Sequence, residues 1–190
     1  EKIYKKFLEK PFSISLSGPI CLHNKDLDKN FKLPKRTISV FDVHPCRDSL
    51  FKSIGFTFEY YTPKHCLSFL KDILIISEKY NFTLCFKAKT NISKMSAHPS
   101  YIKFIDSIRN KSNVLIIPHE TSPYDLIKKT DISIAMPFTS TPMISKVLKK
   151  PSCYYDAYGV INKNDKGAQG IEIIDGLNQL DSWVLKQINF

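Results

Sequence analysis

The feature that most constrains the fold of this 190-residue chain is the regular alternation of apolar runs with helical segments after residue 36. Short apolar runs rich in β-branched and aromatic residues are typical of strands, and they occur at 37–43, 82–89, 113–118, 131–137, 151–156 and 170–175. Helical patterns occur at 62–81, 99–110, 122–130, 141–150 and 178–188. Near-continuous apolar strands are buried on both faces, so the alternation predicts an α/β fold with a doubly wound, Rossmann-like parallel sheet.

Local signals at the helix starts support this assignment of helices and strands. Thr62 is a natural N-cap for the longest predicted helix, because a proline follows it as the first helical residue. Asp72 is expected on the solvated side of the same helix. Ser122 also precedes a proline, and Asp125 follows it three residues later in a pattern close to a capping box.

The chain divides at about residue 35. Residues 1–35 carry no clean period and mix Pro, Gly, Asn and Lys with small apolar clusters, so we interpret them as an irregular connector to one domain at 36–190. No apolar stretch reaches the roughly 18 residues of a membrane-spanning helix, and no signal-peptide pattern occurs. The chain begins at Glu1 rather than Met, so we expect it to be part of a longer protein.

The charge and the cysteines indicate the environment of the protein. The formal net charge is +10, but the lysines are scattered and form no long basic block, so we expect no nucleic-acid partner. A basic surface suits a cytoplasmic protein that works peripherally at the inner face of the membrane, near anionic lipid.

The cysteines have no CxxC spacing, so we expect reduced thiols and no zinc site; they are Cys21, Cys46, Cys66, Cys85 and Cys153.

Polar residues that follow the predicted strands are the candidate site, because ligands of an open parallel sheet bind outside the carboxyl ends of its strands. Imidazole, ammonium, carboxylate and hydroxyl groups are all expected at this rim, from His44, Arg47, Lys87, Lys89, His98, His119, Glu120, Thr121, Ser122, Thr139, Ser140, Thr141, Asp156 and Tyr158. No Walker, GxGxxG, GxSxG or HExxH motif occurs. The common kinase, NTPase and dehydrogenase classes are therefore not indicated.

Three consecutive hydroxyl residues, Thr139, Ser140 and Thr141, stand between a predicted strand and a predicted helix. Unpaired backbone N–H groups and the helix dipole favour an anion at such a place, and the hydroxyls add donors. The alternative is that Ser140 or Thr141 only caps the helix. Both interpretations stay open on the sequence.

Other rim residues also have two interpretations. His98 precedes a proline, so it is either a ligand-facing imidazole or an extended residue at a helix start. Lys87 is a phosphate ligand or a solvated lysine, and Glu120 either binds ribose hydroxyls or is an exposed loop acid. Tyr154 and Tyr155 are expected in the core.

Several segments follow one another in a recognisable order: SVFDVHPCR, FKAK and then HPSY, SPYDLIKKTDISIAMPFTSTPMISKVLKKPSCYYDAYG, and GIEIIDG. On these segments, Thr37 to Trp183 resembles the C-terminal donor-binding domain of GT-B glycosyltransferases that build bacterial surface polysaccharides such as capsule and lipopolysaccharide. The similarity is greatest to enzymes that use CMP-activated acidic sugars, of the sialyltransferase-like or Kdo-transferase-like kind. The region also resembles polymer glycerophosphotransferases, whose Ser-rich turn occupies the same place.

The resemblance implies a glycosyltransferase with a nucleotide-sugar donor, no essential metal and no separate cofactor. It implies that His98 is the catalytic His-Pro residue at the donor phosphate, and that Thr139, Ser140 and Thr141 bind the same phosphate. His44 also precedes a proline and competes for the His-Pro role. The remaining residues of the implied donor site are Lys87, Glu120 and Ser122.

The resemblance also implies that the chain is half of an enzyme. In GT-B enzymes the acceptor and the general base belong to an N-terminal domain, and none is evident here, so residues 36–190 are the expected nucleotide-sugar-binding domain. Its last helix, at 178–188, is expected to reach back toward that other domain, where a saccharide or lipid-linked acceptor binds. Two alternatives stay open: a glycerophosphotransferase or epimerase-type half-domain with the same phosphate cradle, and a non-catalytic docking module of a polysaccharide-synthesis complex.

Overall fold

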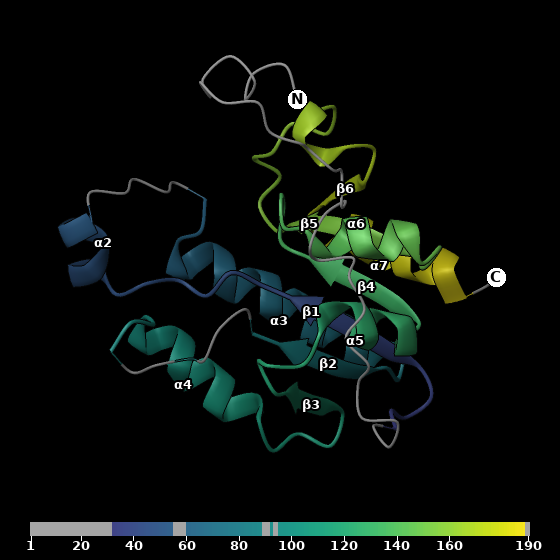
Figure 1. Ribbon diagram of the computed structural model, residues 1–190, viewed down its shortest axis with the longest axis horizontal. Helices are drawn as coiled ribbons and strands as arrows, with labels where there is room; N and C mark the ends of the chain where they lie inside the picture. The colour runs from purple at the N-terminus through teal and green to yellow at the C-terminus, as the bar shows by residue number, and fades with distance from the viewer. Residues whose placement is uncertain (1–31, 55–59, 89–91, 93–94, 189–190) are drawn as a thin grey trace, which may run out of the picture.

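A computed structural model of the chain describes residues 32–54, 60–88, 92 and 95–188. Within them a single sheet is covered by helices on both faces (Figure 1). Most of the connector predicted at 1–35 lies outside the described residues, as do Cys21 and Lys89.

The sheet has six parallel strands in the order β3-β2-β1-β4-β5-β6. The strands are β1 (Thr37–Phe41), β2 (Thr83–Lys87), β3 (Val114–Ile117), β4 (Ile132–Ala135), β5 (Ser152–Asp156) and β6 (Glu172–Asp175). All six coincide with predicted strands, and the predicted doubly wound parallel sheet is confirmed.

The helices connect successive strands. They are α2 (Asp48–Ile54), α3 (Pro63–Lys79), α4 (Pro99–Ile108), α5 (Pro123–Lys129), α6 (Thr141–Val147) and α7 (Gly176–Ile188), with a 3-10 turn, η2, at Lys166–Ala168. Thr62 caps α3 as predicted, since its side chain accepts a hydrogen bond from the backbone N–H of His65. The sequence pattern did not predict α2, which lacks the first-turn proline of the equally short α5 and α6, or η2, which has only three residues.

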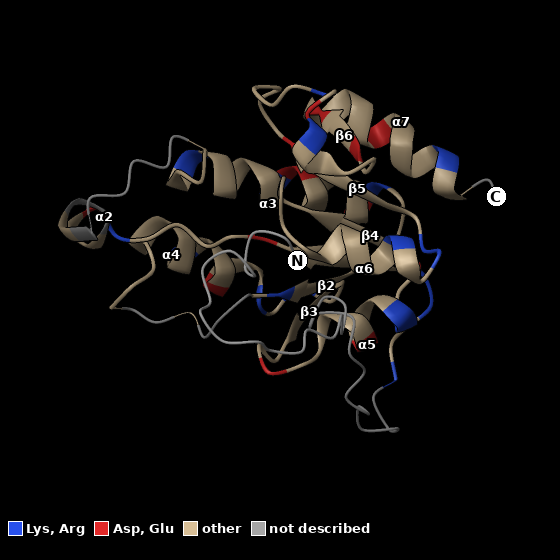
Figure 2. Ribbon diagram, turned by 45° about the horizontal axis from the view of Figure 1, so that its top comes forward, with Lys and Arg blue, Asp and Glu red and all other residues tan. Residues whose placement is uncertain are grey.

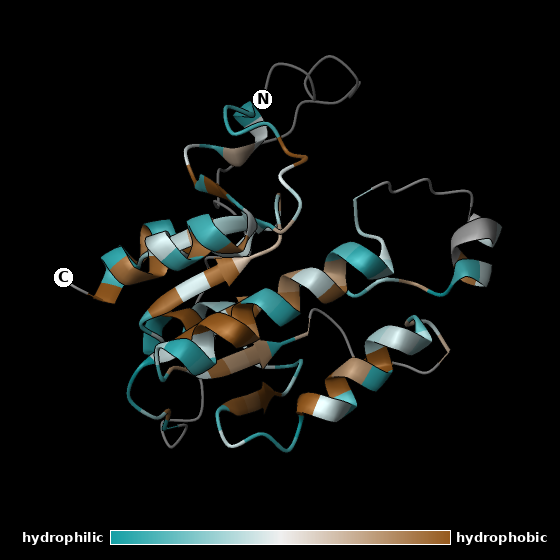
Figure 3. Cartoon of the chain, turned by 180° about the vertical axis from the view of Figure 1, so that it is seen from behind, coloured by the Kyte–Doolittle hydropathy of each residue, from teal (hydrophilic) through white to brown (hydrophobic). Residues whose placement is uncertain are grey.

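The core lies on both faces of the sheet. On one face α3, α4 and α7 pack over residues such as Val40, Phe86 and Tyr155, and on the other face α5 and α6 pack over Cys85 and Tyr154. Figure 3 shows the apolar strands between helices that alternate apolar and polar residues. Cys66, Cys85 and Cys153 are buried and free, as the sequence predicts.

Charged residues are spread over several helices and loops of the described chain rather than gathered in one place (Figure 2). No helix within the described ranges is both long enough and apolar enough to cross a bilayer.

Two local predictions are wrong. Ser122 begins α5 without a side-chain capping bond, and Asp125 is buried rather than completing a capping box, because α5 packs its first turn against the sheet. Asp72 is not simply solvated, since its Oδ2 atom accepts a hydrogen bond of 2.6 Å from the hydroxyl of Tyr155. The ring of Tyr155 is buried and its hydroxyl points toward α3, where it needs an acceptor. Asp72 supplies this acceptor and therefore packs against Tyr155.

The topology fixes where a ligand can bind. β1 and β4 are the two central strands, and the chain leaves them in opposite directions, toward β2 and toward β5. The connections that follow their carboxyl ends therefore diverge and leave a crevice, which is the usual ligand site of a doubly wound sheet.

Candidate functional site

A cavity of about 740 Å³ opens at this crevice. It is lined by the residues after β1, by the end of β2, by the segments after β3 and β4, and by Tyr61 before α3. Seven of the eight residues predicted for the site line it: His44, Lys87, Glu120, Ser122, Thr139, Ser140 and Thr141. The topology thus brings together side chains that lie up to 97 residues apart, from His44 to Thr141.

The loop from Pro137 to Ser140, between β4 and α6, forms one wall of the cavity. Two tyrosine hydroxyls hold its backbone: Tyr61 donates to the carbonyl of Pro137 at 2.8 Å, and Tyr154 donates to the carbonyl of Thr139 at 2.7 Å. Phe138 has a φ of +61°, which a residue with a bulky side chain rarely adopts. Because the surrounding hydrogen bonds fix this unfavourable backbone, the loop has one defined shape.

The three hydroxyls of this wall differ in what they bind within the protein. Thr139 Oγ1 donates to the carbonyl of Met136 at 2.9 Å and lies 3.4 Å from Thr141 Oγ1. Ser140 stands at the N-cap of α6, but its side chain makes no capping hydrogen bond. The capping-only interpretation therefore does not describe Ser140, whose hydroxyl lines the cavity instead.

Lys87 places a positive group beside this wall. The residue is 5% exposed, and its Nζ donates to the carbonyl of Ala88 at 3.3 Å. Burial lowers the pKa of Lys87, and the carboxylate of Glu120 partly opposes that effect. Among the described residues the Lys87 ammonium has no salt-bridge partner, so its charge is available to an anion in the cavity.

The two His-Pro pairs lie next to each other and have different positions. An antiparallel bridge joins Cys46 to Ala97, and the backbone N–H of His98 donates to the carbonyl of Pro45 at 2.8 Å. His44 lines the cavity, with its ring centroid 6.3 Å from that of Tyr101.

Of the eight residues predicted for the donor site, His98 is the one that is not among the lining residues. It stands at the N-cap of α4, where Nδ1 accepts from the backbone N–H of Ser100 and lies 2.7 Å from Ser100 Oγ. The imidazole of His98 thus fixes the start of α4, the helix that carries Tyr101.

Asp42 is a residue of the cavity that the sequence reasoning missed. It is 3% exposed, and the hydroxyl of Tyr101 donates to its Oδ2 atom. Its Oδ1 atom is buried and has no hydrogen-bond partner. Burial raises the pKa of Asp42 to about 7, against the lowering effect of the Tyr101 hydrogen bond. The signal was available, because Asp42 is the single acid inside the apolar run TISVFDV.

A family model described as "Polysaccharide biosynthesis PFTS motif protein" matches residues 1–184. This chain belongs to that family. The four letters of the motif occur in this chain at Pro137, Phe138, Thr139 and Ser140, the loop whose backbone the two tyrosines hold.

Solved structures match this PFTS motif protein at low sequence identity. A UDP-GlcNAc 2-epimerase from Methanocaldococcus jannaschii, solved with UDP-GlcNAc and UDP, matches with a TM-score of 0.51 and 14% identity over 82% of this chain and 40% of its own. KpsC of Thermosulfurimonas dismutans, a beta Kdo 2,4 transferase, matches with a TM-score of 0.41 and 14% identity over 84% of this chain and 47% of its own. The first likeness confirms the Rossmann-like fold. The chain spans less than half the length of either protein, and no curated protein matches it.

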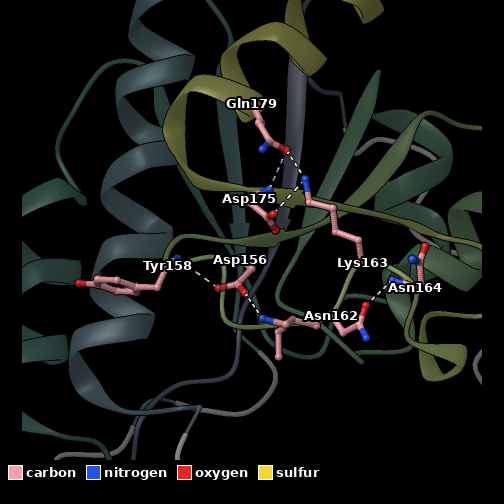
Figure 4. Close-up of polar contacts among 8 residues, drawn as sticks. Asp156, Tyr158, Asn162, Lys163, Asn164, Asp175 and Gln179 are labelled. Carbon is pink, nitrogen blue, oxygen red and sulfur yellow. Dashed lines mark hydrogen bonds and ion pairs between the residues drawn. The ribbon is translucent and has the colours of Figure 1, made fainter.

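In this PFTS motif protein the end of β5 is not part of the cavity wall. Asp156 accepts a hydrogen bond from the hydroxyl of Tyr60 at 3.1 Å. It also accepts hydrogen bonds from the backbone N–H groups of Tyr158 at 3.2 Å and Ile161 at 2.7 Å (Figure 4). Its carboxylate therefore shapes the loop after β5, and Asp156 and Tyr158 do not line the cavity.

His119 and Glu120 form a further polar pair at the cavity. His119 Nδ1 lies 3.3 Å from Glu120 Oε2, and both side chains are partly exposed. Nowhere in the described part of the chain do three or more His, Cys, Asp or Glu side chains gather as metal ligands would.

Proposed function

We propose that this PFTS motif protein supplies the donor-nucleotide-binding half of a GT-B glycosyltransferase that acts in surface polysaccharide synthesis. The observation that carries the proposal is the cavity between β1 and β4, where the PFTS loop, Lys87 and His44 meet. A doubly wound sheet binds its ligand at this crevice, and the residues here are hydrogen-bond donors and a cation, which suit phosphate. Membership of a polysaccharide biosynthesis family supports a sugar as the group that the phosphate activates.

Different residues of the cavity bind different parts of the donor. Ser140 and Thr141 donate hydroxyl hydrogen bonds to the donor phosphate, and the Lys87 ammonium neutralises part of its charge. His44 stabilises the negative charge that develops on the leaving phosphate. Glu120 accepts hydrogen bonds from the ribose hydroxyls, near Ser122.

The proposed catalytic imidazole is His44 rather than His98. His44 lines the cavity, whereas His98 uses its ring to cap α4. His98 is then a positioning residue, because α4 carries Tyr101 next to His44 and Asp42.

The finer proposal is a CMP-activated acidic sugar as donor and a saccharide or lipid-linked acceptor held by another domain of the full protein. A net charge of +10 suits both an anionic donor and an acceptor at a membrane. The second candidate is an epimerase-type half-domain for a uridine nucleotide, because the structure with the TM-score of 0.51 is a UDP-GlcNAc 2-epimerase with UDP-GlcNAc and UDP bound.

Calorimetric titration of the chain with CMP, UDP and CDP-glycerol tests the proposal. We expect CMP to bind most tightly, and Lys87→Met and Ser140→Ala each to weaken binding about tenfold, which corresponds to about 1.4 kcal/mol. Lys111→Ala is the matched control, since Lys111 pairs with Glu78 before β3, at the opposite end of the strands, and should leave binding unchanged.

Each other result has a defined meaning. Tighter binding of UDP favours the epimerase-type half-domain, and tighter binding of CDP-glycerol favours a glycerophosphotransferase. Absence of nucleotide binding, or binding that neither variant weakens, contradicts the proposal and favours a docking module.

A further inference from the structure

The proposed function assigns no role to Asp42, a residue of the cavity whose carboxyl group is buried. It directly follows β1, which lies between β2 and β4, so it sits at the bottom of the crevice. A buried acid in such a place needs partners for both oxygens, because an unpaired polar atom away from water destabilises the fold.

Only one of the two Asp42 oxygens has a partner. The hydroxyl of Tyr101, a residue with 0% exposure on α4, donates to Oδ2 and fixes the orientation of the carboxyl group. Oδ1 is buried, has no hydrogen-bond partner and belongs to a residue that lines the cavity. Tyr101 therefore leaves Oδ1 as the atom that a bound ligand can satisfy.

The surroundings of Asp42 favour its neutral form. The titratable groups packed around it are Tyr101 on α4 and Cys66 on α3, and the cavity adds His44, Cys46 and Lys87. The Lys87 ammonium binds the carbonyl of Ala88 and makes no ion pair with Asp42. Because burial raises the pKa of Asp42 to about 7, both its forms are present at neutral pH. A phosphate in the same cavity shifts the balance toward the neutral form, since two negative charges at close range repel.

We propose that Asp42 binds the donor in its protonated form, donating a hydrogen bond from Oδ1 to the anionic part of the ligand, so that binding takes up a proton from solvent wherever Asp42 is ionised in the free protein. This inference rests on the proposed function, because it needs an anionic donor in the cavity. It makes Asp42 a specificity-determining residue, which favours a ligand with an acceptor at that point.

The test compares the wild type with Asp42→Asn, whose amide is a permanent donor of the same size. The probes are UDP-N-acetylglucosamine and CMP-N-acetylneuraminate, whose phosphates do not titrate between pH 6 and pH 8. We expect the ratio of wild-type to Asp42→Asn affinity to fall about tenfold from pH 6 to pH 8, as a group with a pKa of about 7 requires. Any pH dependence that the two proteins share cancels in this ratio. Calorimetry in buffers of different ionisation enthalpy at pH 7 should show about half a proton more taken up by the wild type than by Asp42→Asn.

Tyr101→Phe is a second, independent variant. It removes the hydrogen bond that stabilises the carboxylate, so the midpoint of the pH dependence should move to higher pH. A purely structural role of Tyr101 would lower affinity equally at every pH. If Asp42→Asn does not fold, the shift in Tyr101→Phe decides alone.

The experiment distinguishes failure of the role of Asp42 from failure of the proposed donor cavity. An affinity ratio that does not change with pH, or loss of binding by Asp42→Asn at every pH, overturns the role of Asp42 and leaves the donor cavity in place. Absence of binding of either probe to the wild type overturns the donor cavity and the role of Asp42 together.

Discussion

Two buried aspartates, Asp42 after β1 and Asp156 at the end of β5, occupy equivalent places at the carboxyl ends of parallel strands and have opposite environments. Asp156 accepts three hydrogen bonds, from one tyrosine hydroxyl and two backbone N–H groups. Asp42 lines the cavity, accepts one hydrogen bond from a tyrosine hydroxyl through its side chain, and has a buried second oxygen without a partner. Position at the rim of the sheet is therefore not enough to identify a ligand residue, and the hydrogen bonds already made within the protein separate the two cases.

The largest expected effect concerns the stability of the fold as a function of pH. Since the folded protein holds the Asp42 proton up to a pKa of about 7 and the unfolded chain releases it near 3.8, the wild-type free energy of unfolding should fall as pH rises between these values. Asp42→Asn lacks this titration. Its free energy of unfolding, relative to that of the wild type, should therefore rise by up to about 4 kcal/mol between pH 4 and pH 8. Urea unfolding at a series of pH values measures the difference. Parallel curves for the two proteins would contradict the ionisation assigned to Asp42.

The next effect separates the aspartates by function. Asp156→Ala leaves the N–H groups of Tyr158 and Ile161 without their acceptor and should lower the free energy of unfolding by about 3 kcal/mol. Asp181→Ala is the control, since Asp181 forms a partly exposed surface pair with Lys79. Nucleotide affinity, measured where Asp156→Ala is still folded, should stay within about twofold of the wild type. A loss of nucleotide affinity as large as that of Lys87→Met would show that the end of β5 belongs to the donor site.

The smallest effect concerns the outer contacts of the same β5 loop. Lys163 Nζ lies 2.9 Å from Asp175 Oδ2 and donates to Gln179 Oε1 at 2.8 Å (Figure 4). Because the Lys163 side chain is about half exposed, Lys163→Ala should lower the free energy of unfolding by only about 0.5 kcal/mol, and by less in high salt. Thermal unfolding at two salt concentrations measures this. A loss comparable to that of Asp156→Ala would show that the outer contacts, rather than the buried carboxylate, hold the loop.

The fold could be predicted from the sequence because its strands and helices carry strong periodic signals. β1 and β4 have five and four consecutive buried residues, so they appear in the sequence as largely apolar runs, interrupted only by small hydroxyl residues. α3 has a clear N-cap at Thr62 and an apolar side. By contrast, α2 is as short as α5 and α6 but lacks the proline that marks the first turn of those two helices.

The site could be predicted only in part, because strand ends are local features and side-chain partners are not. The order of strands and helices was enough to bring His44, Lys87 and the PFTS loop to one cavity. The helix-start role of His98 was one of two interpretations that the sequence left open, and only its contacts with Ser100 in the structure decide between them. The open oxygen of Asp42 depends on Tyr101, 59 residues away.

The two tyrosine hydroxyls that hold the PFTS loop come from outside the motif, one before α3 and one from β5. A graft of Pro137–Ser140 alone into another parallel sheet should therefore adopt a different backbone, because φ is positive at Phe138 only while its neighbours are held. Transfer of the loop geometry requires Tyr61 and Tyr154 to move with the four motif residues. A search for proteins that share this geometry gains selectivity when it asks for all six positions together.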